Sequence, residues 1–342
     1  MDRELRQYQR HGTGIQLLKN RARIEGDSVW LESLADREIW NATAQEVQDA
    51  AIDVVRRRLG AAFELSGVRE WWCFNDSDHT PPCIPKLIRH RLATFLHRVT
   101  GIEFQLLPGE KCRAEPACSF REKREGCPLC VRPFLMARWP VTKRQYSKHE
   151  RGLAASVVGD EILESPGLPR VGVSFEDVNE WLHYDDDLYF RLPTATEWDY
   201  ACRAGTTTKF YWGDEFDPSH VWYEGNSCLH EGDCEILNEI YESVSGSFVM
   251  CSQRPHSPAE HDEQGKHNAF SLVDMIGNVE EWLEDQILAG GSYSDHKGYL
   301  DRSMWTPGPN PMPGATPMHG DGMDDTGFRP AISIPGSRGE SR

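Results

Sequence analysis

The densest group of chemically capable side chains lies between Ala269 and Tyr293. Eight consecutive positions there hold four oxygen-bearing side chains: Asp274, Asn278, Glu280 and Glu281. Gly290 and Gly291 follow, and glycine tolerates the positive φ of a tight turn or a close backbone approach. Taken alone, the pattern predicts a strand, a carboxylate-rich turn and a Gly-Gly bulge that leads into a second strand.

A second group consists of cysteines, of which the chain has ten. Four of them follow one another at Cys112, Cys118, Cys127 and Cys130. Two thiolates spaced Cys-x-x-Cys can hold one tetrahedral ion, which is half of a zinc ribbon. The four cysteines could bind a structural zinc ion, or they could be free thiols or form a disulfide.

The net charge of −17 is unevenly distributed along the chain. Residues 1–100 carry 15 basic and 14 acidic residues, whereas residues 101–342 carry 22 basic and 40 acidic ones. This shift predicts a domain boundary near residue 99. An acidic main domain repels phosphate backbones, which argues against nucleic acid as its partner. The chain has no run of 18 apolar residues and no apolar signal core at its start, so we expect a cytoplasmic protein without a membrane partner.

Residues 1–98 have the pattern of a helical module. Thr43 and Glu46 stand at the spacing of a capping box, and the helix that follows would end at Gly60. We expect a short helix within residues 27–40 and a third helix over residues 86–99, where apolar residues recur at helical spacing.

The middle of the chain predicts the elements that must position the carboxylate-rich turn. Residues 134–141 favour a strand that leads into a helix, Ser174 caps a second helix, and Thr194 begins a third. Arg191 and Glu197 form an internal ion pair in this interpretation. Residues 216–268 contain several cysteines and histidines but fit no metal template, and they are interpreted as a surface insertion.

Several motifs occur in an order that resembles the formylglycine-generating enzyme family, also called the sulfatase-modifying factor family. The first motifs are TGIEFQLLPGE at 100–110, RPFLMARWPVTKRQY at 132–146, PRVGVSFEDVNEWL at 169–182 and YFRLPTATEWDYACRAG at 189–205. YWGDE, NAFSLVDMIGNVEEW, AGGSY and TGFRPA complete the series. The resemblance covers residues 99–333 and implies a loop-rich α+β fold of the C-type-lectin-like kind. Residues 334–342 are left as a flexible tail.

The resemblance implies an oxidase site that this chain does not keep. In the family, two cysteines just after the Gly-Gly-Ser motif bind copper(I), which soft thiolates suit, and a sulfatase cysteine is oxidised to formylglycine. Asp295 and Leu300 occupy these two positions here, and no cysteine follows Cys251. We therefore expect neither copper nor formylglycine formation.

The same resemblance implies a calcium ion at the carboxylate-rich turn. Asp274 and Glu281 would supply carboxylate oxygens, and Gly277 and Val279 would supply backbone carbonyls, which are the hard ligands that calcium prefers. The alternative is that the two carboxylates only cap turns.

Polar and aromatic side chains beyond the Gly-Gly pair border the cleft in this resemblance, and we expect them to bind the ligand. They are Ser292, Tyr293, Asp295, His296, Tyr299, Arg302 and Trp305. Alternatively, these residues pack against the proline-rich loop over residues 306–317.

These observations leave three kinds of function open. A non-catalytic module would bind a protein, a peptide or a small-molecule ligand, and the variable ligand-binding proteins of diversity-generating retroelements are one form of it. An enzyme would use Asp295 and His296 for different chemistry, as an oxidoreductase related to the formylglycine-generating or sulfoxide synthase enzymes. Sulfoxide synthases need a His-x-x-x-His-x-Glu motif, whereas His90 and His97 stand seven positions apart. A structural or regulatory subunit would act through residues 1–98.

Overall fold

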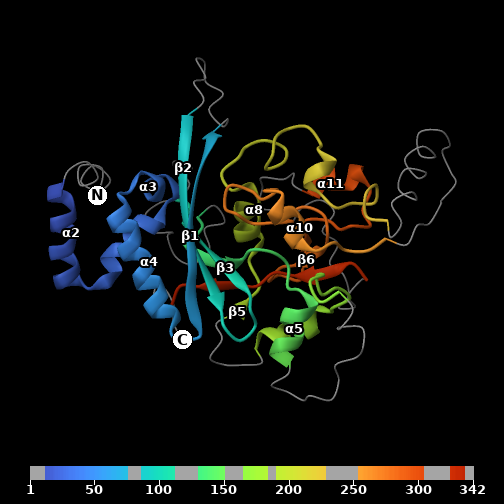
Figure 1. The fold of residues 1–342 in the computed structure, drawn as a ribbon, viewed down its shortest axis with the longest axis horizontal. Helices are drawn as coiled ribbons and strands as arrows, with labels where there is room; N and C mark the ends of the chain where they lie inside the picture. The colour runs from blue at the N-terminus through green and yellow to red at the C-terminus, as the bar shows by residue number, and fades with distance from the viewer. Residues whose placement is uncertain are drawn as a thin grey trace.

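A computed structural model describes residues 12–75, 86–111, 130–150, 165–183, 190–228, 253–303 and 324–335. The first elements are helical: α2 (Gly12–Glu25), η1 (Asp27–Ala35), α3 (Arg37–Ala42) and α4 (Gln45–Leu59). They lie on one side of a long antiparallel hairpin formed by β1 (Phe63–Asn75) and β2 (Lys86–His97), and most of the later described elements lie on its other side (Figure 1).

The hairpin belongs to a six-stranded sheet in the order β1-β2-β3-β4-β9-β5. The remaining strands of this sheet are β3 (Glu103–Leu107), β4 (Phe134–Ala137), β5 (Phe190–Arg191) and β9 (Ala331–Ser333). All of its pairs are antiparallel, and β9 enters from the far end of the chain to lie between β4 and β5.

A second, three-stranded sheet carries the carboxylate-rich turn. Its strands are β6 (Glu280–Trp282), β7 (Leu288–Ala289) and β8 (Thr326–Phe328). β6 lies in the middle, antiparallel to β7 and parallel to β8. Helices and loops surround the two sheets: α5 (Lys143–Glu150), α7 (Phe175–Leu182), α8 (Ala195–Arg203), η2 (Pro218–His220), α10 (Pro258–Glu263) and α11 (Lys297–Ser303).

The expected helix starts in the middle of the chain are confirmed. The side chain of Ser174 accepts the backbone N–H of Asp177 at the start of α7, and Thr194 accepts that of Glu197 at the start of α8. Each is a full capping box, which satisfies backbone donors that a helix start would otherwise leave unpaired. The Glu197 carboxylate also pairs with Arg191 at 2.7 Å, as expected.

The expectation of a helical module through residue 98 is wrong for residues 63–75 and 86–97, which form β1 and β2. β2 pairs with β3, so the main sheet runs across the boundary expected near residue 99. Leu92, Ala93 and Thr94 are all buried, because both faces of the hairpin are covered. A strand buried on both faces loses its alternating pattern, and periodicity alone does not separate it from a buried helix.

The capping box expected at Thr43 is also wrong, although Gly60 does end α4. Ala44 is the N-cap of α4 and makes no side-chain bond there. The Thr43 hydroxyl instead donates to the carbonyl of Ile39 at 2.6 Å, because Thr43 ends the preceding helix α3.

The described part of the stretch 216–268 is not a surface insertion. Val221 and Ser227 are fully buried, and His261 and Asn268 are nearly so. The stretch packs beneath the carboxylate-rich turn and therefore belongs to the frame of the site. Among the residues that the structure describes, no helix is long and apolar enough to cross a membrane.

Candidate functional site

Arg329 holds the segments around the site together. Its side chain is fully buried, and its Nη2 donates to Oε1 of Glu281 at 2.7 Å while its Nε lies 3.1 Å from both Glu281 oxygens. The same guanidinium donates to the backbone carbonyls of Arg138, Val273 and Asp274. One side chain thereby joins β6, the end of β4, the carboxylate-rich turn and the segment after β8.

Two glycines allow the turn to pack closely. Gly277 has φ of 70°, and a Cβ atom there would lie 2.4 Å from the backbone oxygen of Trp222. Gly291 has φ of 69°, and a Cβ atom there would lie 2.5 Å from Leu300 Cδ2. Any side chain at either position would be strained as well as crowded, so the sequence needs glycine at both.

Asp274 lies in a buried polar cluster beneath the turn. Its Oδ1 is 2.6 Å from Nδ1 of His261, and its Oδ2 accepts the Asn278 side-chain amide at 2.7 Å. The indole of Trp222 stacks with the ring of His256, at 3.7 Å between centroids, and with that of His261, at 4.8 Å. The cluster therefore fixes the turn from below through hydrogen bonds and stacked rings.

The residues expected to border the cleft meet around Ser292. Its backbone N–H donates to Asp295 Oδ2 at 2.7 Å, and its hydroxyl lies 2.6 Å from Asp325 Oδ2 and 3.2 Å from Asp295 Oδ2. Asp325 also accepts the hydroxyl of Ser294 at 2.5 Å. Two carboxylates thus converge on one hydroxyl from segments 30 positions apart in the sequence.

A third carboxylate, that of Glu280, completes the group with two tyrosines. The Tyr299 hydroxyl lies 3.4 Å from Glu280 Oε1, and the Tyr293 hydroxyl lies 3.4 Å from the carbonyl of Asp324. Burial, followed by the charges of Asp295 and Asp325, raises the pKa of Glu280 to about 7. Burial also raises the pKa of Asp295, and it raises the pKa of each tyrosine to about 12.

A sequence profile described as "Sulfatase-modifying factor enzyme 1-like domain" matches residues 116–329, which is more than half of the chain. This chain belongs to the sulfatase-modifying factor family. The α+β fold expected from the motifs is confirmed by this membership and by the mixed helices and sheets of the structure.

Individual relatives match over shorter stretches. The chain is 32% identical over 127 residues to the formylglycine-generating enzyme of Mycobacterium tuberculosis, covering 36% of this chain and 35% of that protein. It is 27% identical over 166 residues to that of Streptomyces coelicolor, covering 42% and 47%. It is 26% identical over 147 residues to inactive C-alpha-formylglycine-generating enzyme 2 of Bos taurus, covering 40% and 42%. The chain thus spans less than half the length of these relatives.

Two solved structures show weaker likeness. Treponema denticola variable protein 1 aligns with a TM-score of 0.39 and 17% identity, covering 69% of this chain and 97% of that one. CarF aligns with a TM-score of 0.36 and 19% identity, covering 60% and 88%. At these scores neither structure carries an argument about function.

The positions where the resemblance places the two thiols of the sulfatase-modifying factor family do not fit copper(I). Asp295 offers a hard carboxylate that already accepts the Ser292 N–H, and Leu300 is fully buried and has no donor atom. A soft ion that needs two thiolates has no ligand pair at these positions.

The calcium ligands expected from the family do not fit that ion either in this arrangement. Both oxygens of Asp274 are taken by His261 and Asn278. Glu281 accepts the Arg329 guanidinium and the Trp198 indole N–H, which lies 2.9 Å from Oε2. The Gly277 carbonyl accepts the N–H of Val279. Internal donors already bind three of the four expected ligand groups, and calcium binding stays a prediction that these contacts do not favour.

We expect neither calcium nor a chelator to change the melting temperature of this protein. The Asp274 and Glu281 carboxylates already form hydrogen bonds with internal groups, so an added ion would have to displace these groups. Differential scanning calorimetry of the protein with excess calcium and with EDTA measures this. A rise in melting temperature with calcium that EDTA reverses would show that the turn does bind the ion.

The structure brings some of the expected cleft residues together and leaves others apart. Ser292, Asp295 and Tyr299 meet at one place, Tyr293 is buried beside them, and His296 is exposed. The side chain of Arg302, Trp305, and the loop over 306–317 fall outside the described residues. So do Cys112, Cys118 and Cys127 of the proposed zinc site, whose fourth member, Cys130, is exposed.

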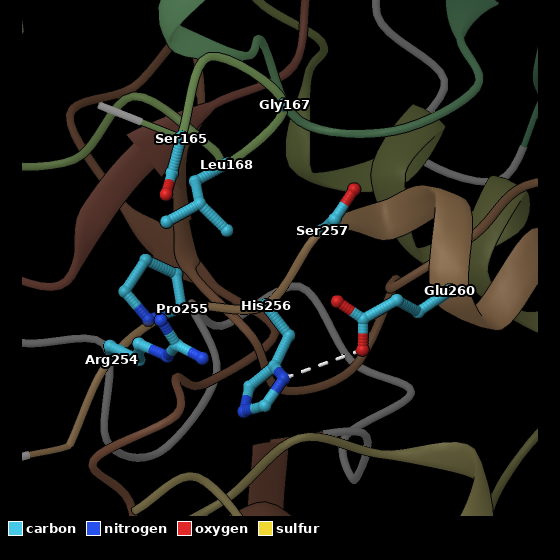
Figure 2. A pocket seen from close by; sticks show the side chains of 8 residues that line it. All are labelled: Ser165, Gly167, Leu168, Arg254, Pro255, His256, Ser257 and Glu260. Atoms are coloured by element: carbon cyan, nitrogen blue, oxygen red, sulfur yellow. Dashed lines mark ion pairs between the residues drawn. The ribbon is translucent and has the colours of Figure 1, made fainter. Parts of the chain in front are cut away.

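A separate hollow of about 260 Å³ lies beside His256 (Figure 2). Its lining consists of Ser165, Gly167, Leu168, Arg254, Pro255, His256, Ser257 and Glu260. The His256 Nδ1 atom lies 3.6 Å from Glu260 Oε2, and burial lowers the pKa of His256, which keeps the imidazole neutral near pH 7. None of the residues of the cleft lines this hollow, so the two are distinct.

Sequence reasoning missed several members of the site. Glu280 and Asp325 lie in the cleft, and His261 and Trp222 lie below the turn. One signal could have found Asp325, because it directly precedes the TGFRPA motif. Nothing in the local pattern connects His261 with Asp274.

Proposed function

We propose that this member of the sulfatase-modifying factor family binds a ligand in the cleft around Ser292 and does not form formylglycine. The observation that carries the proposal is the pair of residues at the two thiol positions. Asp295 and Leu300 offer no thiolate, whereas the frame around them is fully built through Arg329 and Glu281. The ligand is a protein, a peptide or a small molecule.

The arrangement of these residues supports binding. Tyr299 is 37% exposed beside Glu280, so it offers both ring area and a hydroxyl to a ligand. The backbone below it is fixed by the close packing of Gly277 and Gly291. Side chains on a rigid backbone lose little conformational entropy when they bind, which favours affinity.

The double change Asp295→Asn and Tyr299→Ala is expected to abolish ligand capture. It removes one carboxylate and the exposed ring of the cleft, and loss of an anchoring aromatic side chain typically weakens binding by about 2 kcal/mol or more. Wild-type and variant proteins are immobilised and exposed to extract of the source cells. Mass spectrometry then compares the proteins, peptides and small molecules that each retains.

Glu64→Gln provides the matched control, because it removes a carboxylate from an exposed ion pair with Arg98 on the β1-β2 hairpin. This control should retain what the wild type retains, and circular dichroism should show that both variants are folded. A folded double variant that captures the same molecules as the wild type would place the binding surface outside the cleft.

The same proteins distinguish a binding module from an oxidase. Incubation with a sulfatase-derived cysteine peptide, copper and oxygen is expected to leave the peptide mass unchanged. Conversion of the cysteine to formylglycine by the wild type, and not by the double variant, would make the cleft an active site instead.

A further inference from the structure

The three carboxylates of the cleft have no cationic partner in the described part of the chain. Among the described residues, the donors to Asp295 and Asp325 are hydroxyl and backbone amide groups, and the donor to Glu280 is the Tyr299 hydroxyl. No described lysine, arginine or histidine forms an ion pair with any of them. Partly buried carboxylates without a counter-charge are costly, and elsewhere in this protein the buried carboxylate of Glu281 is neutralised by Arg329.

Thr326 supplies an independent sign of a missing partner. Its side chain is fully buried, and its hydroxyl has no hydrogen-bond partner. Thr326 is the register partner of Glu280 in the parallel pair of β6 and β8. Paired residues on neighbouring strands project from the same face of a sheet, so the hydroxyl lies on the face that carries the Glu280 carboxylate. A buried hydroxyl seldom lacks a partner, and a ligand in the cleft would provide one.

The arrangement favours an organic cation over a metal ion. Within the described ranges, no three His, Cys, Asp or Glu side chains converge closely enough to hold a metal. The acceptors are instead spread over Glu280, Asp295 and Asp325, with the exposed ring of Tyr299 at the edge. An ammonium or guanidinium group carries several N–H donors and is attracted to an aromatic face, so it can satisfy acceptors at several points.

We propose that the cleft binds an ammonium or guanidinium group, held by the carboxylates of Glu280, Asp295 and Asp325 and by the hydroxyl of Thr326. This inference rests on the proposed function, because it names the ligand class of the same cleft. The cation can belong to a free amine or to the side chain of a lysine or arginine in a peptide. The chemistry of recognition is the same in both cases.

Isothermal titration calorimetry with four defined probes tests the inference. The probes are the capped peptides acetyl-Gly-Lys-Gly-amide, acetyl-Gly-Arg-Gly-amide and acetyl-Gly-Gln-Gly-amide, and the free amine 1,5-diaminopentane. A cationic probe is expected to bind at least about tenfold more tightly than the glutamine peptide, since charged hydrogen bonds replace neutral ones. The affinity should fall as salt is added. Tighter binding of the diamine than of the peptides would identify a free amine as the source, and the reverse order would identify a peptide.

Two variants locate the cation. Asp295→Asn combined with Asp325→Asn is expected to lower the affinity of the cationic probe by about tenfold or more. Thr326→Val keeps the shape of the side chain and removes only the hydroxyl, so binding should weaken while the melting temperature is retained. Glu64→Gln should bind as the wild type does. Affinity that is unchanged in the first two variants would overturn the assignment.

Different outcomes would overturn the cationic class of the ligand and the location of the binding site. Equal binding of the cationic and glutamine peptides, or no binding of any probe, would overturn the cation class. If the Asp295→Asn and Tyr299→Ala protein still loses the ligand captured from extract, the cleft remains the binding site for a ligand of another class. If that variant keeps the ligand, the proposed function fails as well.

Discussion

Arg329→Met is expected to lower the free energy of unfolding by about 3–5 kcal/mol, or to prevent folding, because it leaves the buried Glu281 carboxylate without its counter-charge. Arg329 and Glu281 are both at most 1% exposed, so water does not replace the lost guanidinium. The backbone carbonyls of Val273 and Asp274 lose their donor at the same time. Urea unfolding followed by circular dichroism measures the change.

The exposed pair of Arg98 and Glu64 provides the comparison for this result. Arg98→Met should cost less than about 1 kcal/mol, because solvent screens an exposed ion pair. The double change Arg329→Met and Glu281→Leu should recover part of the loss, since it removes both charges from the interior. An Arg329→Met protein as stable as Arg98→Met would show that this pair does not hold the frame.

A chain that begins at residue 99 is expected to fail to fold, although the charge distribution suggests a boundary there. Removal of residues 1–98 takes away β1 and β2 and leaves the edge of β3 unpaired. The truncation also removes the ring of Phe63, which contacts Phe104 and Phe190, and the ring of His97, which contacts Phe190. Near-ultraviolet circular dichroism and hydrogen exchange of the purified fragment would report the loss of fixed packing.

A chain that begins at residue 26 provides the matched control for this truncation. Of the described elements it loses α2 alone, whose Leu18 packs with Val29 and Val47 in a small cluster apart from the main core. This shorter truncation should keep the native spectrum. A cooperative unfolding transition in the fragment from residue 99 would show that the main domain is independent of the hairpin after all.

Interactions between residues close in the sequence could be predicted, whereas contacts between distant segments could not. The caps at Ser174 and Thr194 need only residues three positions away, so the pattern contains the whole interaction. Residues 86–97 have the pattern of a helix although they form β2. Elements distant in the chain cover both faces of this strand, so its sequence lacks the alternation of a half-exposed strand. The stretch 216–268 was expected at the surface for the same kind of reason, since its burial depends on contacts with the carboxylate-rich turn.

The candidate site shows the same limit. Ser292, Asp295 and Tyr299 could be placed together because they follow one another within eight positions. Glu280 lies on β6, and Asp325 directly precedes β8, the strand that pairs with β6 in parallel. No short-range pattern shows which strands will pair. Two of the three carboxylates of the site therefore come together with Asp295 only in the folded chain, so the sequence alone did not indicate the ligand class.

The position of β9 has a consequence for how this protein is made in the cell. Ile332 pairs with both Leu135 and Phe190, so the centre of the large sheet stays open until residue 333 has left the ribosome. At a synthesis rate of roughly 5–20 residues per second, this interval after β4 lasts about ten seconds or more. During that time β4 has one unpaired edge and β5 has none of its partners. We therefore expect these edges to be open to pairing with other molecules while the chain is being made.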